Sequence, residues 1–111
     1  MHPTAADLAH LIRDTGRVRV LTDPSTPLAD LTRYEAVTSL VEALRADPHA
    51  DVMDWMQWPD LWLELHDVDS RPLVTLGLLS PDWIRWDPHG DFRLADHTAL
   101  TTWLSTWTAR G

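Results

Sequence analysis

The clearest pattern in the chain is a strict alternation of apolar and polar positions in residues 61–66. The apolar positions are Leu61, Leu63 and Leu65, and the positions between them are Trp62, Glu64 and His66. A period of two is typical of a half-buried strand. Similar patterns predict strands over residues 73–79 and 83–86, and turn-forming residues separate the three segments. Residues 51–86 are therefore expected to form an antiparallel meander, with weaker strand candidates at 51–56 and 92–94.

Three other segments carry apolar residues at helical spacing, and we expect helices over residues 4–14, 32–46 and 96–108. Thr4 is the expected N-cap of the first helix, and Asp96 that of the last. Thr32 and Glu35 have the spacing of a capping box for the second. The stripe of the last helix includes Trp103 and Trp107, which are expected to pack in the core. Residues 17–21 alternate like a strand, and residues 22–27 are expected to form a turn-rich connection.

These elements predict an α+β fold, with an antiparallel meander sheet of four to five strands and about three helices packed mainly on one face. The length of 111 residues suits a single domain. The eight prolines all fall at expected element boundaries, and no repeat or linker interrupts the pattern. We therefore expect residues 1–111 to form one α+β domain.

Composition narrows the partners and the location. The net charge is −8, with nine arginines and no lysine, which argues against nucleic acid and anionic membranes as partners. The chain has no cysteine, so disulfides and thiolate chemistry are excluded. No apolar run reaches the roughly 20 residues of a membrane span, and no secretory signal is recognisable at the N-terminus. A cytoplasmic location is the expectation.

The candidate binding surface is the face of the meander that points away from the helices. The hypothesis assigns it Trp62, Glu64, His66, Trp83 and Arg85, together with Asp67 and Asp69 of the following turn. Two tryptophans beside charged groups exceed what a solvated sheet face needs, and Trp and Arg are common interface anchors. The alternative is an ordinary outer face whose tryptophans pack on a strand or a loop.

An acidic stretch lies in the same part of the chain. Residues 46–70 contain seven carboxylates and no arginine. Several flank prolines or turns, where aspartate is favoured for local reasons. The remainder predicts a negative patch at the edge of the sheet that could attract a basic partner.

Motifs for catalysis or for metal and cofactor binding are weak. No serine nucleophile motif is present, and the four glycines do not cluster into a phosphate loop. Glu64 and His66 share a strand face and could act as an acid–base pair. His66, Asp67 and Asp69 contain ligand-type atoms but match no established metal spacing. We expect no metal and no cofactor.

The run LWLELHDVDSRPLVTLGLL, followed by IRW and later by TTWL, resembles small hypothetical proteins of GC-rich, actinomycete-type bacteria. The resemblance covers roughly the C-terminal half of the chain and implies no activity. In format the chain is also similar to small immunity or inhibitor proteins, which are acidic, single-domain and free of cysteine.

These observations leave three hypotheses. The first is a non-enzymatic protein-binding domain, immunity-like or an accessory subunit, that binds a protein partner, a basic one among the candidates, or a second copy of itself. The second is a small-molecule binder or small enzyme with Glu64 and His66 as acid and base. The third is a structural domain whose tryptophans are all core.

Overall fold

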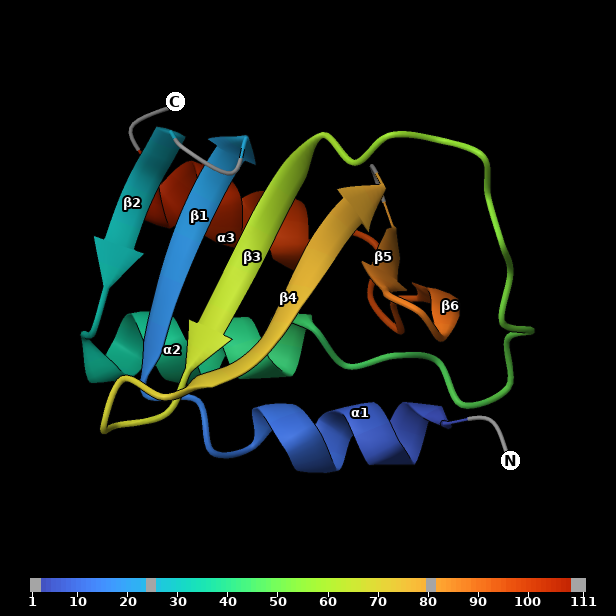
Figure 1. The fold of residues 1–111 in the computed structure, drawn as a ribbon, viewed down its shortest axis with the longest axis horizontal. Coiled ribbons are helices and arrows are strands. Elements are labelled where there is room, and N and C mark those ends of the chain that lie inside the picture. Colours follow the sequence, from blue (N-terminus) through green and yellow to red (C-terminus); the bar gives the residue numbers. More distant parts are fainter. Residues whose placement is uncertain (1–2, 24–25, 80–81, 109–111) are drawn as a thin grey trace.

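The computed structural model describes residues 3–23, 26–79 and 82–108 (Figure 1). Within these ranges the chain forms three helices and six strands. The helices are α1 (Ala5–Ile12), α2 (Tyr34–Ala43) and α3 (Ala99–Trp107). The strands are β1 (Arg17–Asp23), β2 (Thr26–Leu31), β3 (Leu61–His66), β4 (Pro72–Leu79), β5 (Trp83–Trp86) and β6 (Gly90–Arg93). The fold is α+β, as the sequence predicts.

All six strands belong to one antiparallel sheet with the order β2-β1-β3-β4-β5-β6. Strands β3 to β6 form the expected meander, in which each strand pairs with the next. The hairpin of β1 and β2 joins the meander through β1, which pairs with β3. The long segment between α2 and β3 runs around the β6 edge before it reaches the start of β3 (Figure 1).

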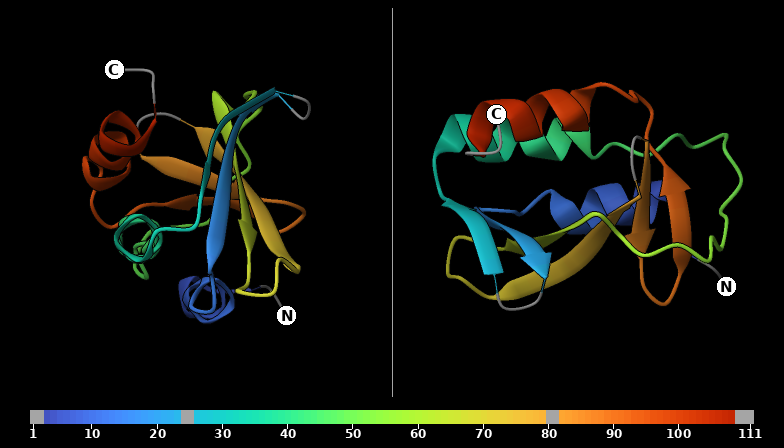
Figure 2. Two further views of the ribbon diagram at one scale, coloured as in Figure 1. Left: turned by 90° about the vertical axis from the view of Figure 1, so that its left-hand side faces the viewer. Right: turned by 90° about the horizontal axis from the view of Figure 1, so that it is seen from above.

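The core lies between the sheet and the helices. Helices α2 and α3 lie side by side against one face of the sheet, and α1 lies below α2 and contacts β4 (Figures 1 and 2). The largest side chains buried there come from every layer: Leu8 and Ile12, Leu40 and Leu44, Val18 and Val20, Leu63, Leu65, Leu76, Ile84 and Leu100. Trp103 is 4% exposed and its indole N–H donates to the Ala36 carbonyl at 2.8 Å, so its predicted core position is confirmed.

The N-terminal third confirms one predicted cap and corrects another. Thr4 caps α1 in a reciprocal capping box with Asp7. The Thr32–Glu35 capping box is wrong, because the chain stays extended through Arg33, which is the N-cap and makes no side-chain cap hydrogen bond. Asp96 does not directly precede α3 either; its carboxylate accepts hydrogen bonds from Thr98, the residue at the N-cap.

The sheet has six strands where four to five were predicted. The unpredicted strand is β2, which begins at Thr26 and Pro27 in the expected turn and continues through residues 28–31. Its sequence, TPLADL, has no clear alternation, and proline is confined to edge strands since it cannot donate to a ladder. The strand forms through its neighbour: it pairs with β1, and Arg17 Nε donates to Asp30 Oδ1 at 2.8 Å. Residues 51–56 are not a strand; only Met53 makes an isolated bridge, to Asp91.

In the described ranges no helix is both long enough and apolar enough to cross a membrane.

Candidate functional site

The sheet register brings the predicted surface residues of two strands onto one face. The face opposite the core carries Trp62, Glu64 and His66 from β3 and Trp83 and Arg85 from β5. Gly77 of β4 pairs with Trp62 on one side and with Arg85 on the other. Directly paired residues point to the same side of a sheet, so the predicted register and face are correct.

Half of this face is covered. The segment of residues 51–60, here called the projecting loop, crosses β5 and β6. Met53 and Asp91 exchange both main-chain hydrogen bonds, at 2.9 and 2.7 Å. The Trp55 ring meets the Trp83 ring edge-on, with centroids 5.7 Å apart. Trp83 therefore packs against a loop, which is the alternative that the sequence left open, and the Arg85 side chain is only 15% exposed.

An ion pair under the projecting loop fixes its main chain. Arg85 Nε donates to Asp91 Oδ1 at 2.9 Å, and Asp91 is fully buried. The rest of the guanidinium donates to the carbonyls of Gln57, at 2.8 Å, and Trp55. The Trp55 N–H donates in turn to Asp91 Oδ2 at 2.7 Å. One buried charge pair thus satisfies three polar groups of the loop main chain, which anchors the middle of the loop to the sheet.

The charge of Arg85 is secure. Its hydrogen bond to Asp91 raises the pKa of the guanidinium above its usual value, and the nearby charges of Asp87 and Asp54 act in the same direction. The guanidinium of Arg85 is therefore charged at neutral pH. Arg85 is a structural anchor of the loop rather than an open contact residue.

Two glycines let the projecting loop approach the sheet closely. A Cβ on Gly77 would come within 2.6 Å of Pro59 Cγ. A Cβ on Gly90, whose φ is +124°, would come within 2.7 Å of Val52 Cγ1 and 2.9 Å of the Met53 carbonyl oxygen. A side chain at either position would push the loop outward, so the two glycines belong to the same anchoring arrangement as the ion pair.

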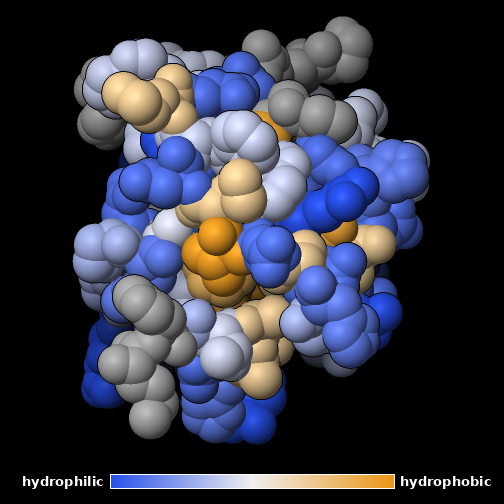
Figure 3. Space-filling model, turned by 90° about the vertical axis from the view of Figure 1, so that its right-hand side faces the viewer, coloured by the Kyte–Doolittle hydropathy of each residue, from blue (hydrophilic) through white to orange (hydrophobic). Residues whose placement is uncertain are grey.

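The projecting loop carries most of the large apolar side chains that are strongly exposed in the described part of the chain. Among the described residues, the strongly exposed large apolar side chains are Tyr34, Val52, Met53, Trp55, Met56, Trp58 and Val68, and five of these seven belong to the loop. Met56 is 104% exposed and Trp58 is 86% exposed. On this side of the molecule, apolar side chains gather near the middle, with hydrophilic ones around them (Figure 3). Sequence reasoning treated residues 51–56 as a weak strand and missed this role; the available signal was DVMDWMQWPD, rich in Met and Trp without alternation.

The other half of the sheet face is an ion-pair network. Glu64 Oε1 lies 2.7 Å from His66 Nε2 and 3.1 Å from Arg19 Nη1. Hydrogen bonds from His66 and then Arg19 lower the pKa of Glu64. The neighbouring Asp30 is bound by Arg17, which lowers the pKa of that carboxyl as well. Glu64 and His66 lie together as predicted, but each is engaged by its neighbours.

Asp67 and Asp69 lie in the connection between β3 and β4, at the end of β3 away from the projecting loop (Figure 1). Asp67 Oδ1 accepts the main-chain N–H groups of Asp69, at 2.8 Å, and Arg71, at 2.9 Å. Asp67 therefore holds the turn together, as aspartates in turns commonly do. Asp69 is exposed. The structure does not bring these two residues to the tryptophans with which the sequence grouped them.

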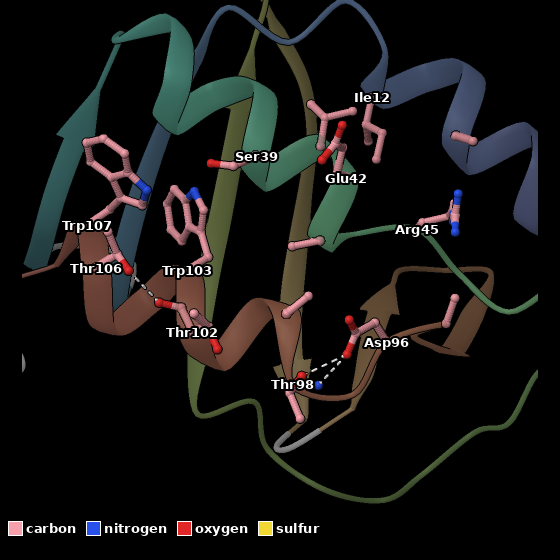
Figure 4. Close-up of a pocket in the computed structure, with 15 residues that line it drawn as sticks. Ile12, Ser39, Glu42, Arg45, Asp96, Thr98, Thr102, Trp103, Thr106 and Trp107 are labelled. Carbon is pink, nitrogen blue, oxygen red and sulfur yellow. Dashed lines mark hydrogen bonds between the residues drawn. The ribbon is translucent and has the colours of Figure 1, made fainter.

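Two hollows of the described surface lie away from Glu64 and His66. One of about 950 Å³ lies among α1, α2 and α3 (Figure 4). Hydroxyl groups that line it are engaged by their own helices: Ser39 donates to the Glu35 carbonyl at 2.6 Å, and Thr106 to that of Thr102 at 2.9 Å. The other, of about 520 Å³, lies at the base of the projecting loop and is lined by Val52, Met53, Asp54, Arg85 and residues 87–91.

No family model matches the chain, and no curated protein or solved structure matches it significantly. Among residues 3–23, 26–79 and 82–108, no group of three or more His, Asp or Glu side chains is placed to hold a metal ion.

Proposed function

We propose that this protein is a non-enzymatic protein-binding domain and that the projecting loop is its contact surface. The observation that carries the proposal is the exposure of Met56 and Trp58 on a segment whose main chain is anchored beneath them. The surface differs from the sheet face that the sequence favoured, because Trp83 and Arg85 lie under the loop and support it.

The energetics of such a loop favour binding. Large apolar side chains that are fully in water gain free energy when a partner buries them, roughly 1.5–3 kcal/mol each for side chains of this size. Tryptophan is the residue most enriched among binding hot spots, and methionine adapts its shape to irregular pockets. An unanchored loop would lose conformational entropy on binding, whereas the Arg85–Asp91 pair has already ordered this one.

The small, acidic format supports an immunity-like or inhibitor-like role, or that of an accessory subunit, in the cytoplasm. An acid–base reaction at Glu64 and His66 has less support. Neither hollow described above is lined by these residues, and a small-molecule site needs a concave pocket that surrounds the reacting groups.

Affinity capture from the native lysate tests the proposal, with wild-type protein, Trp58→Ala and Tyr34→Ala as baits. Tyr34 is an aromatic residue that is 80% exposed at the start of α2, so it is a matched control for loss of an exposed ring. The free energy of unfolding of each variant should lie within about 0.5 kcal/mol of the wild-type value, since neither substitution removes a buried group. We expect a protein that wild type and Tyr34→Ala retain and that Trp58→Ala loses. If Trp58→Ala captures the same proteins as wild type, the loop is not the contact surface.

A further inference from the structure

We infer that the partner of the projecting loop has an apolar pocket bordered by arginine or lysine side chains. This inference rests on the proposed function and adds the chemistry of the partner. It follows from the exposed charges in the loop that carries Met56 and Trp58 and at the base of that loop, and from what the fold does with the other carboxylates of the acidic stretch.

Most acidic residues between 46 and 70 that lie away from the loop have local roles. Asp47 Oδ1 accepts the His49 N–H at 2.9 Å. Glu64 is paired with Arg19 and His66. Asp67 holds its turn through two main-chain hydrogen bonds. These three carboxylates are engaged by hydrogen bonds or ion pairs within the fold, so they are not the ones that a partner would contact.

The carboxylates at the loop are different. Asp51 and Asp54 are exposed in the loop itself, and Asp87 is exposed in the turn between β5 and β6. Asp54 and Asp87 line the same hollow, and the charges of both raise the pKa of Arg85. The hydrogen bonds of Arg85 itself go to Asp91 and to the loop main chain. In the described part of the chain, none of these three exposed aspartates has an ion-pair partner within 4 Å.

The arrangement has the anatomy of an interface, with an apolar centre and hydrophilic surroundings (Figure 3). A basic partner would meet this rim with complementary charge, which speeds association and selects the partner. A second copy of this chain would bring the same aspartates against one another across a two-fold axis, at a net charge of −8 for each copy. An anionic membrane surface is repelled for the same reason.

A display library is the probe. It consists of a folded three-helix domain with randomised surface positions, in which acidic and basic residues are equally frequent. The library is selected on wild-type protein and depleted on Trp58→Ala. We expect clones that need Trp58, that carry a clear excess of Arg and Lys, and that bind about tenfold more weakly to Asp51→Asn/Asp54→Asn or at raised salt. Asp69→Asn removes an exposed charge far from the loop and should bind them unchanged.

The outcomes separate the two proposals. Clones that need Trp58 but show no basic excess, or bind the double asparagine variant unchanged, overturn the inference and leave the loop as a binding surface. If no clone depends on Trp58, both the inference and the proposed function fail. Light scattering and vesicle co-sedimentation check the other occupants. A dimer that Trp58→Ala abolishes, or Trp58-dependent binding to phosphatidylcholine vesicles, would replace the basic protein with a second copy or a lipid surface.

Discussion

Removal of one partner of the Arg85–Asp91 ion pair is expected to lower the free energy of unfolding strongly. In Arg85→Ala the buried carboxylate of Asp91, whose side chain is 1% exposed, loses its cation. Breaking one side of a buried ion pair costs about 3–5 kcal/mol, because the remaining charge stays desolvated. The two loop carbonyls that Arg85 also binds should add little, since they lie near the surface and water can replace the donor. A loss of this size is a large part of the 5–15 kcal/mol that typically stabilises a domain.

Urea unfolding followed by tryptophan fluorescence measures the effect, and thermal unfolding should show a midpoint lower by more than about 10 °C. Arg71→Ala is the matched control, because Arg71 is exposed in the β3–β4 connection and should change stability by at most about 0.5 kcal/mol. Arg85→Met/Asp91→Leu removes both charges and should recover part of the loss, since no charge is left buried alone.

The loop itself provides a second measurement. Arg85→Lys keeps the charge, but an ammonium group cannot span Asp91 and two carbonyls as the guanidinium does. We expect faster hydrogen exchange at the Met53 and Asp91 amides and better acrylamide quenching of Trp83, with the rest of the fold intact. An Arg85→Ala variant within about 1 kcal/mol of wild type, with unchanged exchange at these amides, would refute the idea that this pair holds the loop.

Three further predictions concern the two glycines, Glu64 and Asp67. Gly77→Ala and Gly90→Ala should each lower stability by about 1–3 kcal/mol in urea unfolding, because the added methyl group collides with the loop; unchanged midpoints would show that the loop gives way freely. Hydrogen bonds from His66 and Arg19 lower the pKa of Glu64, so its stabilising contribution is complete above the ordinary value of 4.5 and is lost as pH falls through the folded value. The urea unfolding midpoint of Glu64→Gln should therefore fall less steeply with decreasing pH than that of the wild type. Identical pH profiles of the two proteins would contradict this. Asp67→Ala should cost about 0.5–2 kcal/mol through the lost turn hydrogen bonds, whereas Asp67→Asn should retain most of them; equal losses would point to charge instead.

The candidate site was only partly predictable. Alternation in β3 and β5 was enough to place Trp62, Glu64, Trp83 and Arg85 on one face, because side-chain direction in a strand follows directly from position. Whether that face is open was not encoded locally. Asp91 is thirty-six positions from Trp55 in the chain, and no periodic pattern marks a segment whose main chain is bound by Asp91, Arg85 and Leu78, on three strands.

The sequence by itself determined the α+β class, the meander of β3 to β6, the three helices and the apolar residues of the core. These are properties of local period and of turn residues, which act over a few positions. The tertiary structure decided what those rules do not reach. It made residues 26–31 a strand by pairing them with β1. It kept the chain extended through Arg33, so that Arg33 rather than Thr32 is the N-cap of α2. It also placed residues 51–60 across β5 and β6. Each depends on partners far away in the chain, and for the projecting loop those partners are a buried ion pair and two glycines that only the folded sheet brings together.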